Sequence, residues 1–298
     1  MRGFLSLVKR NCLVFLRDRG AVIMSMLSMG IVLMLMGIFI ADSNISAITE
    51  LLDKFGGARN SEADLLNAKV LVHYWTLAGI TVVNAVMASL TVMGQMISDT
   101  AENRLASFYS APVSKNAVAL SYIAASVIVG TMMCLIVTAA YIGYIVYIGG
   151  GLLSVKNMAF AVLYTLITVF IFSLIMYLAA MLVRSTGVWS GIGTVVGTLV
   201  GFAGAIYMPM GSLSDEIASA VKCIPVLRRV LCDDILRKTF DGLPEAVLDG
   251  YKEYMGITVK MGDDILSDGS QLLFVCLFGL AALVLILIIT AKRRASDR

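Results

Sequence analysis

Charged and aromatic side chains that could engage a partner are concentrated in one short stretch, residues 98–115 (SDTAENRLASFYSAPVSK). Acidic residues near its start favour a helix N-terminus, an apolar stripe at i, i+3 and i+4 follows, and a proline ends the helix. These candidate contact residues are Asp99, Glu102, Arg104, Leu105, Phe108, Tyr109 and Pro112. A short amphipathic helix of this kind could dock into a partner's groove or lie on a membrane, and the spacing favours neither.

Two other sets of residues could either line a substrate route or pack helices together. Within residues 70–97, polar and small side chains recur every three or four positions and share one helical face: Thr81, Asn84, Ala88, Thr91 and Gln95. Within residues 187–207, a tandem GxxxG pattern comprises Gly193, Gly197, Gly201 and Gly204. We favour packing for both sets, with Asn84 and Gln95 bonded to neighbouring backbone, and keep the substrate route as the alternative.

Several other chemistries are excluded or disfavoured. No GxxxxGK[ST] loop occurs, so the chain does not bind ATP by that route. The single imidazole, His73, is expected far from Ser190 across the membrane, which argues against intramembrane hydrolysis. The acids Asp263, Asp264 and Asp268 lack the spacing of a calcium loop, and we predict no metal site. A formal net charge of +3 does not indicate a nucleic-acid partner.

The composition assigns these residues to a membrane protein. Of the 298 residues, 59% are hydrophobic and 14% are charged, more apolar surface than one soluble core can bury. Six apolar runs have the length of membrane spans: 21–41, 70–97, 118–148, 158–183, 187–207 and 271–291. None contains Asp, Glu, Lys or Arg. The second and third exceed the bilayer thickness and must tilt or project beyond it. We therefore predict an all-α integral membrane protein with six transmembrane helices.

Charge asymmetry orients the predicted spans. The two termini and the connections on their side carry a net charge of +8, whereas the opposite connections carry −5, which together make the formal +3. Positively charged segments remain in the cytoplasm. We therefore expect both termini to be cytoplasmic.

The hydrophilic segments are predicted to add helices outside the spans. Residues 1–20 place Phe4, Val8, Cys12 and Phe15 on one face and basic residues on another, which is typical of an amphipathic helix at the headgroup boundary. Residues 45–55 predict one short outer helix. The extracytoplasmic segment 208–270 predicts two or three more before the last span, with prolines near their starts. If this segment is extracytoplasmic, a disulfide between its two cysteines, Cys223 and Cys232, is possible.

Several blocks of the sequence resemble the membrane subunits of ABC-2-type exporters. Residues 1–20 resemble the connecting helix of that family, and residues 74–94 (YWTLAGITVVNAVMASLTVMG) resemble its second span. Residues 97–115 resemble its coupling region. Residues 197–213 (GTLVGFAGAIYMPMGSL) and 224–231 (IPVLRRVL) resemble the end of the fifth span and the stretch that follows. The nearest resemblance is to bacterial exporters of drugs or natural products.

The resemblance implies a permease of the bacterial cell membrane that forms a homodimer, or a heterodimer with a related permease, and binds two ABC ATPase subunits. ATP and Mg²⁺ would be used by the ATPase, and this chain would bind no cofactor. The ATPase would dock on the 98–112 helix, and the cargo would be an apolar or amphipathic compound. An exporter of polysaccharide, lipid-linked glycan or peptide is one alternative. A non-transporting sensor or immunity protein, with 208–270 as its binding domain, is another.

Overall fold

The computed structural model describes residues 2–35, 41–55, 60–105, 113–204, 209–214 and 228–258, with single residues and short pieces elsewhere. This part of the chain is helical apart from a hairpin of β1 (Lys260–Met261) and β2 (Asp264–Ile265). Three helices are long and apolar enough to cross a membrane: α4 (Ser61–Ala101), α6 (Lys115–Tyr147) and α7 (Val155–Leu182). The predicted all-α membrane fold is confirmed.

The remaining predicted spans coincide with shorter helical pieces. The first corresponds to α2 (Arg19–Leu35) and the fifth to α8 (Thr186–Ala203). Only part of the sixth lies within the described residues, where 279–286 are helical and Ala282 and Ile286 belong to the same buried apolar cluster as Leu174 of α7. The span boundaries drawn from the sequence therefore remain predictions.

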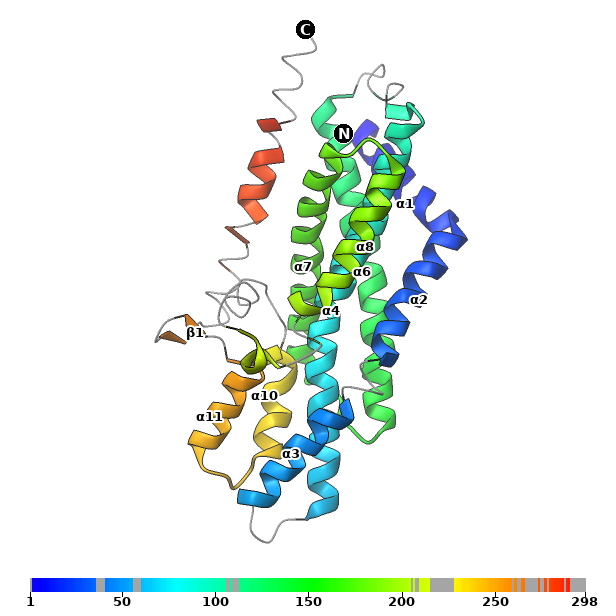
Figure 1. Cartoon of the computed structure of the whole chain (residues 1–298). Helices are drawn as coiled ribbons and strands as arrows, with labels where there is room; N and C mark the ends of the chain where they lie inside the picture. The colour runs from blue at the N-terminus through cyan, green and yellow to red at the C-terminus, as the bar shows by residue number, and fades with distance from the viewer. Residues whose placement is uncertain are drawn as a thin grey trace.

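α4 is the axis of the molecule and runs through its full length (Figure 1). Its 41 residues correspond to about 60 Å of helix, roughly twice the thickness of a bilayer core. The Asn60 side chain caps its first turn by accepting hydrogen bonds from the backbone N–H groups of Glu62 and Ala63. The sequence placed residues 60–69 in a connection, but they extend α4 by more than two turns beyond the predicted span.

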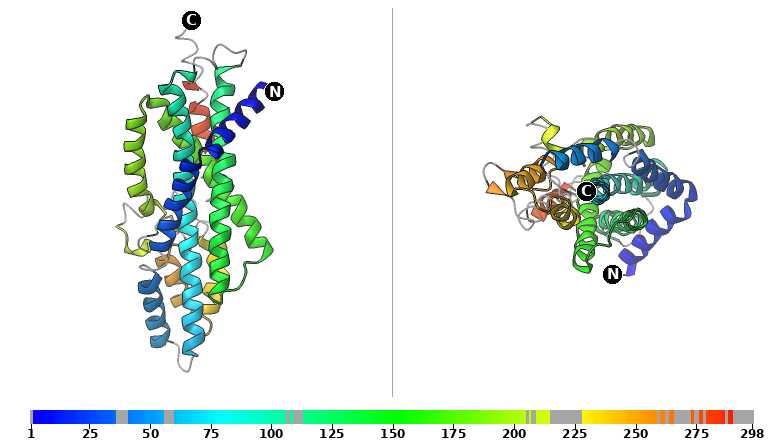
Figure 2. Two further views of the ribbon diagram at one scale, coloured as in Figure 1. Left: turned by 90° about the vertical axis from the view of Figure 1, so that its right-hand side faces the viewer. Right: turned by 90° about the horizontal axis from the view of Figure 1, so that it is seen from below.

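The two ends of the bundle differ in what surrounds α4. One end, called here the α1 end, holds α1 (Arg2–Arg17), the end of α4, the start of α6 and the connection from α7 to α8 (Figures 1 and 2). The opposite end, called here the α3 end, holds α3 (Ala41–Phe55), α10 (Arg228–Thr239) and α11 (Glu245–Tyr254). The two fully described connections between predicted spans, α6 to α7 and α7 to α8, lie at opposite ends of the bundle.

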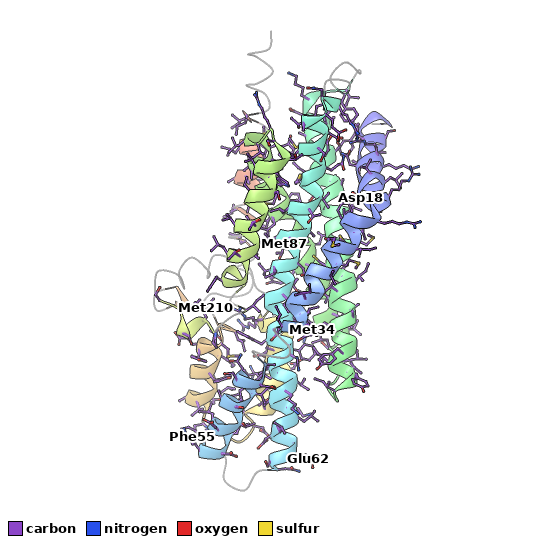
Figure 3. All side chains as sticks on the ribbon, turned by 45° about the vertical axis from the view of Figure 1, so that its right-hand side comes forward. Asp18, Met34, Phe55, Glu62, Met87 and Met210 are labelled. Atoms are coloured by element: carbon purple, nitrogen blue, oxygen red, sulfur yellow. The ribbon has the colours of Figure 1, made fainter. Side chains whose placement is uncertain are left out.

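The helices outside the spans follow the predicted pattern. α1 buries Val8 and Phe15, which confirms the predicted amphipathic helix. It joins α2 at Asp18, whose side chain accepts a hydrogen bond from the backbone N–H of Ala21 (Figure 3). α3 confirms the short helix expected at 45–55. Between residues 208 and 258 the structure describes α10, α11 and a single 3-10 turn, η2 (Met210–Ser212).

Serine hydroxyls join the three long helices in the middle of the bundle. Ser173 of α7 lies 3.2 Å from the hydroxyl of Ser89 on α4 and 2.8 Å from that of Ser126 on α6. All three side chains are fully buried. Small residues let helices approach closely, and hydroxyl pairs of this kind hold the interface in register. The central packing is therefore both apolar and hydrogen-bonded.

Candidate functional site

Asp99 is a fully buried carboxylate in the last turn of α4. Both terminal nitrogens of Arg10 on α1 donate to it, one of them at 2.9 Å. The hydroxyl of Tyr122 on α6 donates at 2.6 Å, and the amide of Gln95 donates at 3.1 Å. A buried carboxylate is costly unless it is paired and hydrogen-bonded. These donors meet that requirement and bring α1, α4 and α6 together at one point.

Asp99 lies at the C-terminal end of α4, where its charge needs the cation of Arg10. The C-terminus of a helix carries partial negative charge, so a carboxylate there is disfavoured without a cation beside it. Arg10 supplies that cation, and its hydrogen bond and charge pairing with Asp99 raise the pKa of Arg10 above its ordinary value. The Arg10 guanidinium also donates to the Asn11 side chain at 3.0 Å. Asn11 in turn donates to Ser121 of α6 at 3.2 Å, which fixes α1 against α6.

The predicted coupling segment, residues 98–115, contains this carboxylate near its start. α4 ends at Ala101 with Glu102 as its C-cap, and Asn103 adopts a left-handed backbone conformation with φ of 58°, which asparagine tolerates better than most residues. Arg104 pairs with Glu102 and lies 3.7 Å from the Asp99 carboxylate. The ring of Phe108 lies 5.1 Å beneath the Arg10 guanidinium. Movement of residues 102–108 would therefore disturb the partners of Asp99. We call Arg10, Gln95, Asp99, Arg104 and Tyr122 the Asp99 cluster.

The structure corrects part of the predicted coupling helix. Asp99 and Glu102 do not open a new helix, because the hydrogen bonding of α4 continues past residue 97 to Ala101. Leu105 and Phe108 are partly buried against the core rather than fully presented to a partner. The half-exposed charges of this segment are Glu102 and Arg104. Tyr109 and Pro112 lie outside the described residues.

The sequence missed the partners of Asp99. Arg10 was assigned to the polar, solvent side of the amphipathic helix, and Tyr122 was treated as an ordinary residue of an apolar span. The available signal was an acidic side chain only two positions beyond an apolar run of 28 residues, which calls for a cation and a donor nearby. The sequence alone gave no basis for choosing Arg10 among the basic residues of α1.

Comparison with known proteins agrees with this architecture. The sequence profile of the ABC-2 type transporter family matches residues 2–226, which include α1, the Asp99 cluster and the long helices. The chain belongs to the ABC-2 type transporter family. No curated protein and no solved structure matches it significantly. As an ABC-2 membrane chain it is a transport subunit, and its family membership implies association with separate ABC ATPase subunits.

In this ABC-2 chain the polar stripe on α4 serves chiefly the helix itself. Thr81 and Thr91 donate to carbonyls one turn earlier, Leu77 at 2.9 Å and Met87 at 2.7 Å. Gln95 bonds Asp99 rather than backbone, so that part of the prediction is wrong. Among the described residues, the buried side-chain oxygen of Asn84 has no hydrogen-bond donor. The predicted backbone bond of Asn84 is therefore not seen there either.

Two glycines of α8, Gly193 and Gly197, and its C-cap Gly204 face α4. Gly193 lies against Leu90 and Gly197 against Met87. Gly204 approaches Gly79 of α4 so closely that a Cβ added to either glycine would lie within 3.0 Å of the other's carbonyl oxygen. The placement of Gly193, Gly197 and Gly204 matches the packing interpretation. A role in a substrate route stays a prediction.

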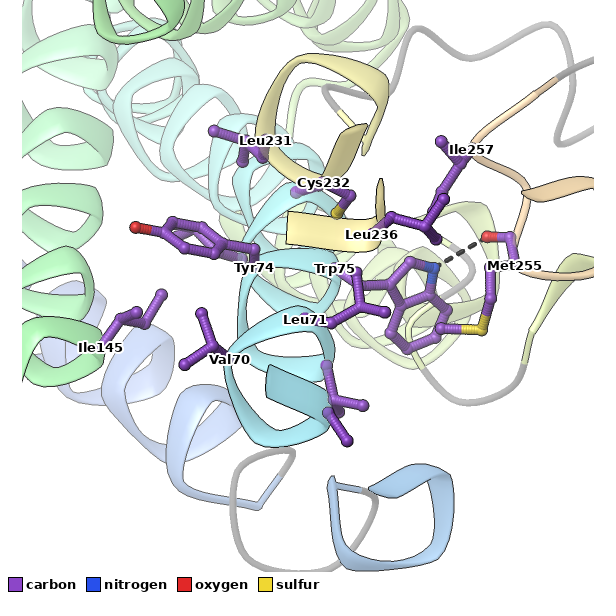
Figure 4. Close-up of a cluster of buried hydrophobic side chains, with 14 of the residues drawn as sticks. Val70, Leu71, Tyr74, Trp75, Ile145, Leu231, Cys232, Leu236, Met255 and Ile257 are labelled. Carbon is purple, nitrogen blue, oxygen red and sulfur yellow. Dashed lines mark hydrogen bonds between the residues drawn. The ribbon is translucent and has the colours of Figure 1, made fainter. Parts of the chain in front are cut away.

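At the α3 end, a buried arginine fixes the outer helices to the bundle. Arg228 of α10 is only 1% exposed, donates to the carbonyl of Gly204 at the end of α8, and lies 5.2 Å above the Trp75 ring. Burial lowers the pKa of Arg228 to about 10. Its charge faces the negative end of the α8 dipole. Figure 4 shows the Trp75 indole N–H donating to the Met255 carbonyl at 2.8 Å, within the apolar cluster that joins α4 to this region.

The disulfide that the sequence leaves possible is not seen at Cys232. Cys232 is a free, fully buried thiol on α10, and burial raises its pKa. Cys223 lies outside the described residues. Cys232 instead belongs to the apolar cluster around Trp75.

Proposed function

We propose that this ABC-2 chain is the permease subunit of an ATP-driven exporter in the bacterial cell membrane. Both termini would be cytoplasmic, so the α1 end would face the ATPases and the α3 end the outside. Two ABC ATPase subunits would bind ATP and Mg²⁺ and dock on residues 98–112. The permease would form a homodimer or pair with a related chain. The cargo would be an apolar or amphipathic compound, such as a drug or natural product.

The Asp99 cluster is the observation that carries the coupling proposal. Its hydrogen bonds and ion pairs connect the segment after α4 to three helices at once. In a buried site these interactions are strong when satisfied and costly when broken. Displacement of Arg104 and Phe108 by a docked ATPase would thus be transmitted to α1, α4 and α6 together. An exposed loop lying on the membrane would lack such a connection.

The chemistry of the spans supports an apolar or amphipathic cargo. The predicted spans contain no acidic or basic side chain apart from His73. His73 is buried, and its ring nitrogen Nδ1 lies 2.9 Å from the Tyr141 hydroxyl. The threonine hydroxyls of the α4 stripe are occupied by their own helix. A highly hydroxylated or charged cargo would find few unoccupied polar side chains along the predicted spans.

Affinity purification of the tagged full chain from its native host tests the coupling proposal. We expect an ABC ATPase to co-purify. The charge reversal Glu102→Lys should release it, because it reverses a half-exposed charge offered to the partner and leaves Arg104 beside Asp99. The charge reversal Asp233→Lys on α10 is the matched control and should retain the ATPase. Undiminished recovery with Glu102→Lys would contradict docking at this segment.

A further inference from the structure

A cavity of about 680 Å³ lies at the α3 end between three helices. Its walls come from the start of α3, the first three turns of α4 and the last turn of α6. Figure 3 shows Glu62, one of the lining residues, at the far tip of α4. The volume is within the range of small-molecule sites.

The cavity lies where the predicted spans end. Asp42 directly follows the first predicted span, Lys69 directly precedes the second, and Ile148 ends the third. Their convergence places the cavity at the depth of lipid headgroups, where charged and apolar groups of one ligand can both be accommodated.

Three charged side chains line this cavity: the acids Asp42 and Glu62 and the cation Lys69. Asp42 and Lys69 both line it, and both act electrostatically on His73, with opposite signs. Asp42 and Lys69 therefore both lie near His73 in the cavity wall. Within the described part of the chain, neither of these two exposed side chains forms an ion pair. A ligand that carried both charges could satisfy both residues.

The remaining walls are preorganised and partly apolar. His73 is held by Tyr141, and the Tyr144 ring packs edge-on against it at a centroid distance of 5.3 Å. An aromatic face of this kind attracts ammonium groups. Leu65 and Leu66 of α4 also line the cavity and are 40% and 38% exposed. These leucines offer contact for the apolar portion of a ligand.

We propose that this cavity binds a zwitterion that carries one ammonium group and one phosphate or carboxylate. Asp42 binds the ammonium, with the Tyr144 ring beside it, and Lys69 binds the anionic group. The ligand is either the headgroup of a zwitterionic phospholipid such as phosphatidylethanolamine or a soluble zwitterion. Binding requires no ATPase, so a test of zwitterion binding is independent of the proposed ATP-driven export.

The test is a binding titration of the purified full chain in detergent, freed of native lipid. The probes are dihexanoyl-phosphatidylethanolamine, O-phosphoethanolamine and dihexanoyl-phosphatidylglycerol. We expect saturable binding of the ethanolamine lipid that weakens roughly tenfold or more in Asp42→Asn and in Lys69→Gln, since each removes one charge-assisted contact. The matched variants Asp53→Asn and Lys54→Gln, exposed on α3 and absent from the cavity wall, should bind like the unmodified chain.

The probes also separate the two sources of ligand. Binding of O-phosphoethanolamine with the same dependence on Asp42 and Lys69 would support a soluble zwitterion. Binding of only the ethanolamine lipid, with that dependence, would support a lipid headgroup. The proposal is overturned if no probe binds saturably, if both cavity variants bind as well as the controls, or if the glycerol lipid binds as tightly as the ethanolamine lipid. Unchanged thermal unfolding of the variants shows that they remain folded.

Discussion

Replacing Arg10 by methionine removes the cation from the Asp99 cluster while keeping a side chain of similar length. The Asp99 carboxylate remains fully buried and at the negative end of the α4 dipole. It retains the hydrogen bonds from Tyr122 and Gln95 but loses both bonds from Arg10. The remaining donors only partly replace the lost charge.

The expected cost is about 3 kcal/mol in the free energy of unfolding. Removing one partner of a buried ion pair costs about 3–5 kcal/mol. We take the lower end because the Arg10 side chain is 26% exposed and two other donors remain. The double variant Arg10→Met/Asp99→Asn should regain about 2 kcal/mol of this loss, since it leaves no uncompensated charge. Such coupling between contacting residues is measured by a double-mutant cycle.

Detergent-induced unfolding followed by tryptophan fluorescence measures both values. The chain has two tryptophans, Trp75 at the α3 end and Trp189 near the α1 end, where its indole N–H donates to the Leu90 carbonyl at 3.3 Å. The control is Arg17→Met, an exposed position on the same helix, which should change stability by less than about 0.5 kcal/mol. An Arg10→Met variant as stable as this control, or a double variant whose losses simply add, would refute the reasoning.

Three other predictions concern the α3 end and its connection to the bundle. Gly79→Ala should lower the free energy of unfolding by about 1–3 kcal/mol, because its Cβ would lie 2.8 Å from the Gly204 carbonyl oxygen. Gly143→Ala is the control and should not lower it, because a Cβ there meets no atom within 4 Å. Equal stability of the two variants would contradict the close approach of Gly79 and Gly204. Arg228→Ala should cost about 3 kcal/mol in the same unfolding assay through the lost charged hydrogen bond and the space left behind, and a change below about 0.5 kcal/mol would argue against a structural role. In a variant that keeps Cys232 as its one cysteine, maleimide labelling at pH 8 should require denaturation, because burial blocks access to the thiol and raises its pKa. Rapid labelling of the folded protein would show that α10 is not packed as described.

Hydrophobic periodicity was sufficient to predict most of the helices. The faces of α1 and α3 follow directly from the spacing of their apolar residues, and the length of α6 follows from a run too long for one bilayer crossing. Helices and their apolar faces depend on residues a few positions apart, so they can be predicted from the sequence.

The partners of Asp99 depend instead on packing between distant segments. Polar residues after an apolar run locally favour a new helix start, and that local preference placed Asp99 wrongly. The backbone hydrogen bonds of α4 continue because Arg10, 89 positions earlier, offsets the charge of the carboxylate. Arg228 likewise meets Gly204 only because α10 packs against α4 and α7. No local pattern specifies either pairing.

The measurement that tests the central claim most directly is photo-crosslinking from position 104 in the native host. A benzophenone amino acid replaces Arg104, the half-exposed member of the Asp99 cluster, and the same amino acid replaces Lys156 near the start of α7, at the α3 end, as the control. The account predicts an ABC ATPase crosslinked from position 104, in an amount that changes when ATP is depleted, and none from position 156. An ATPase crosslinked equally from both positions, or from neither while the chain still exports, would contradict coupling through this segment.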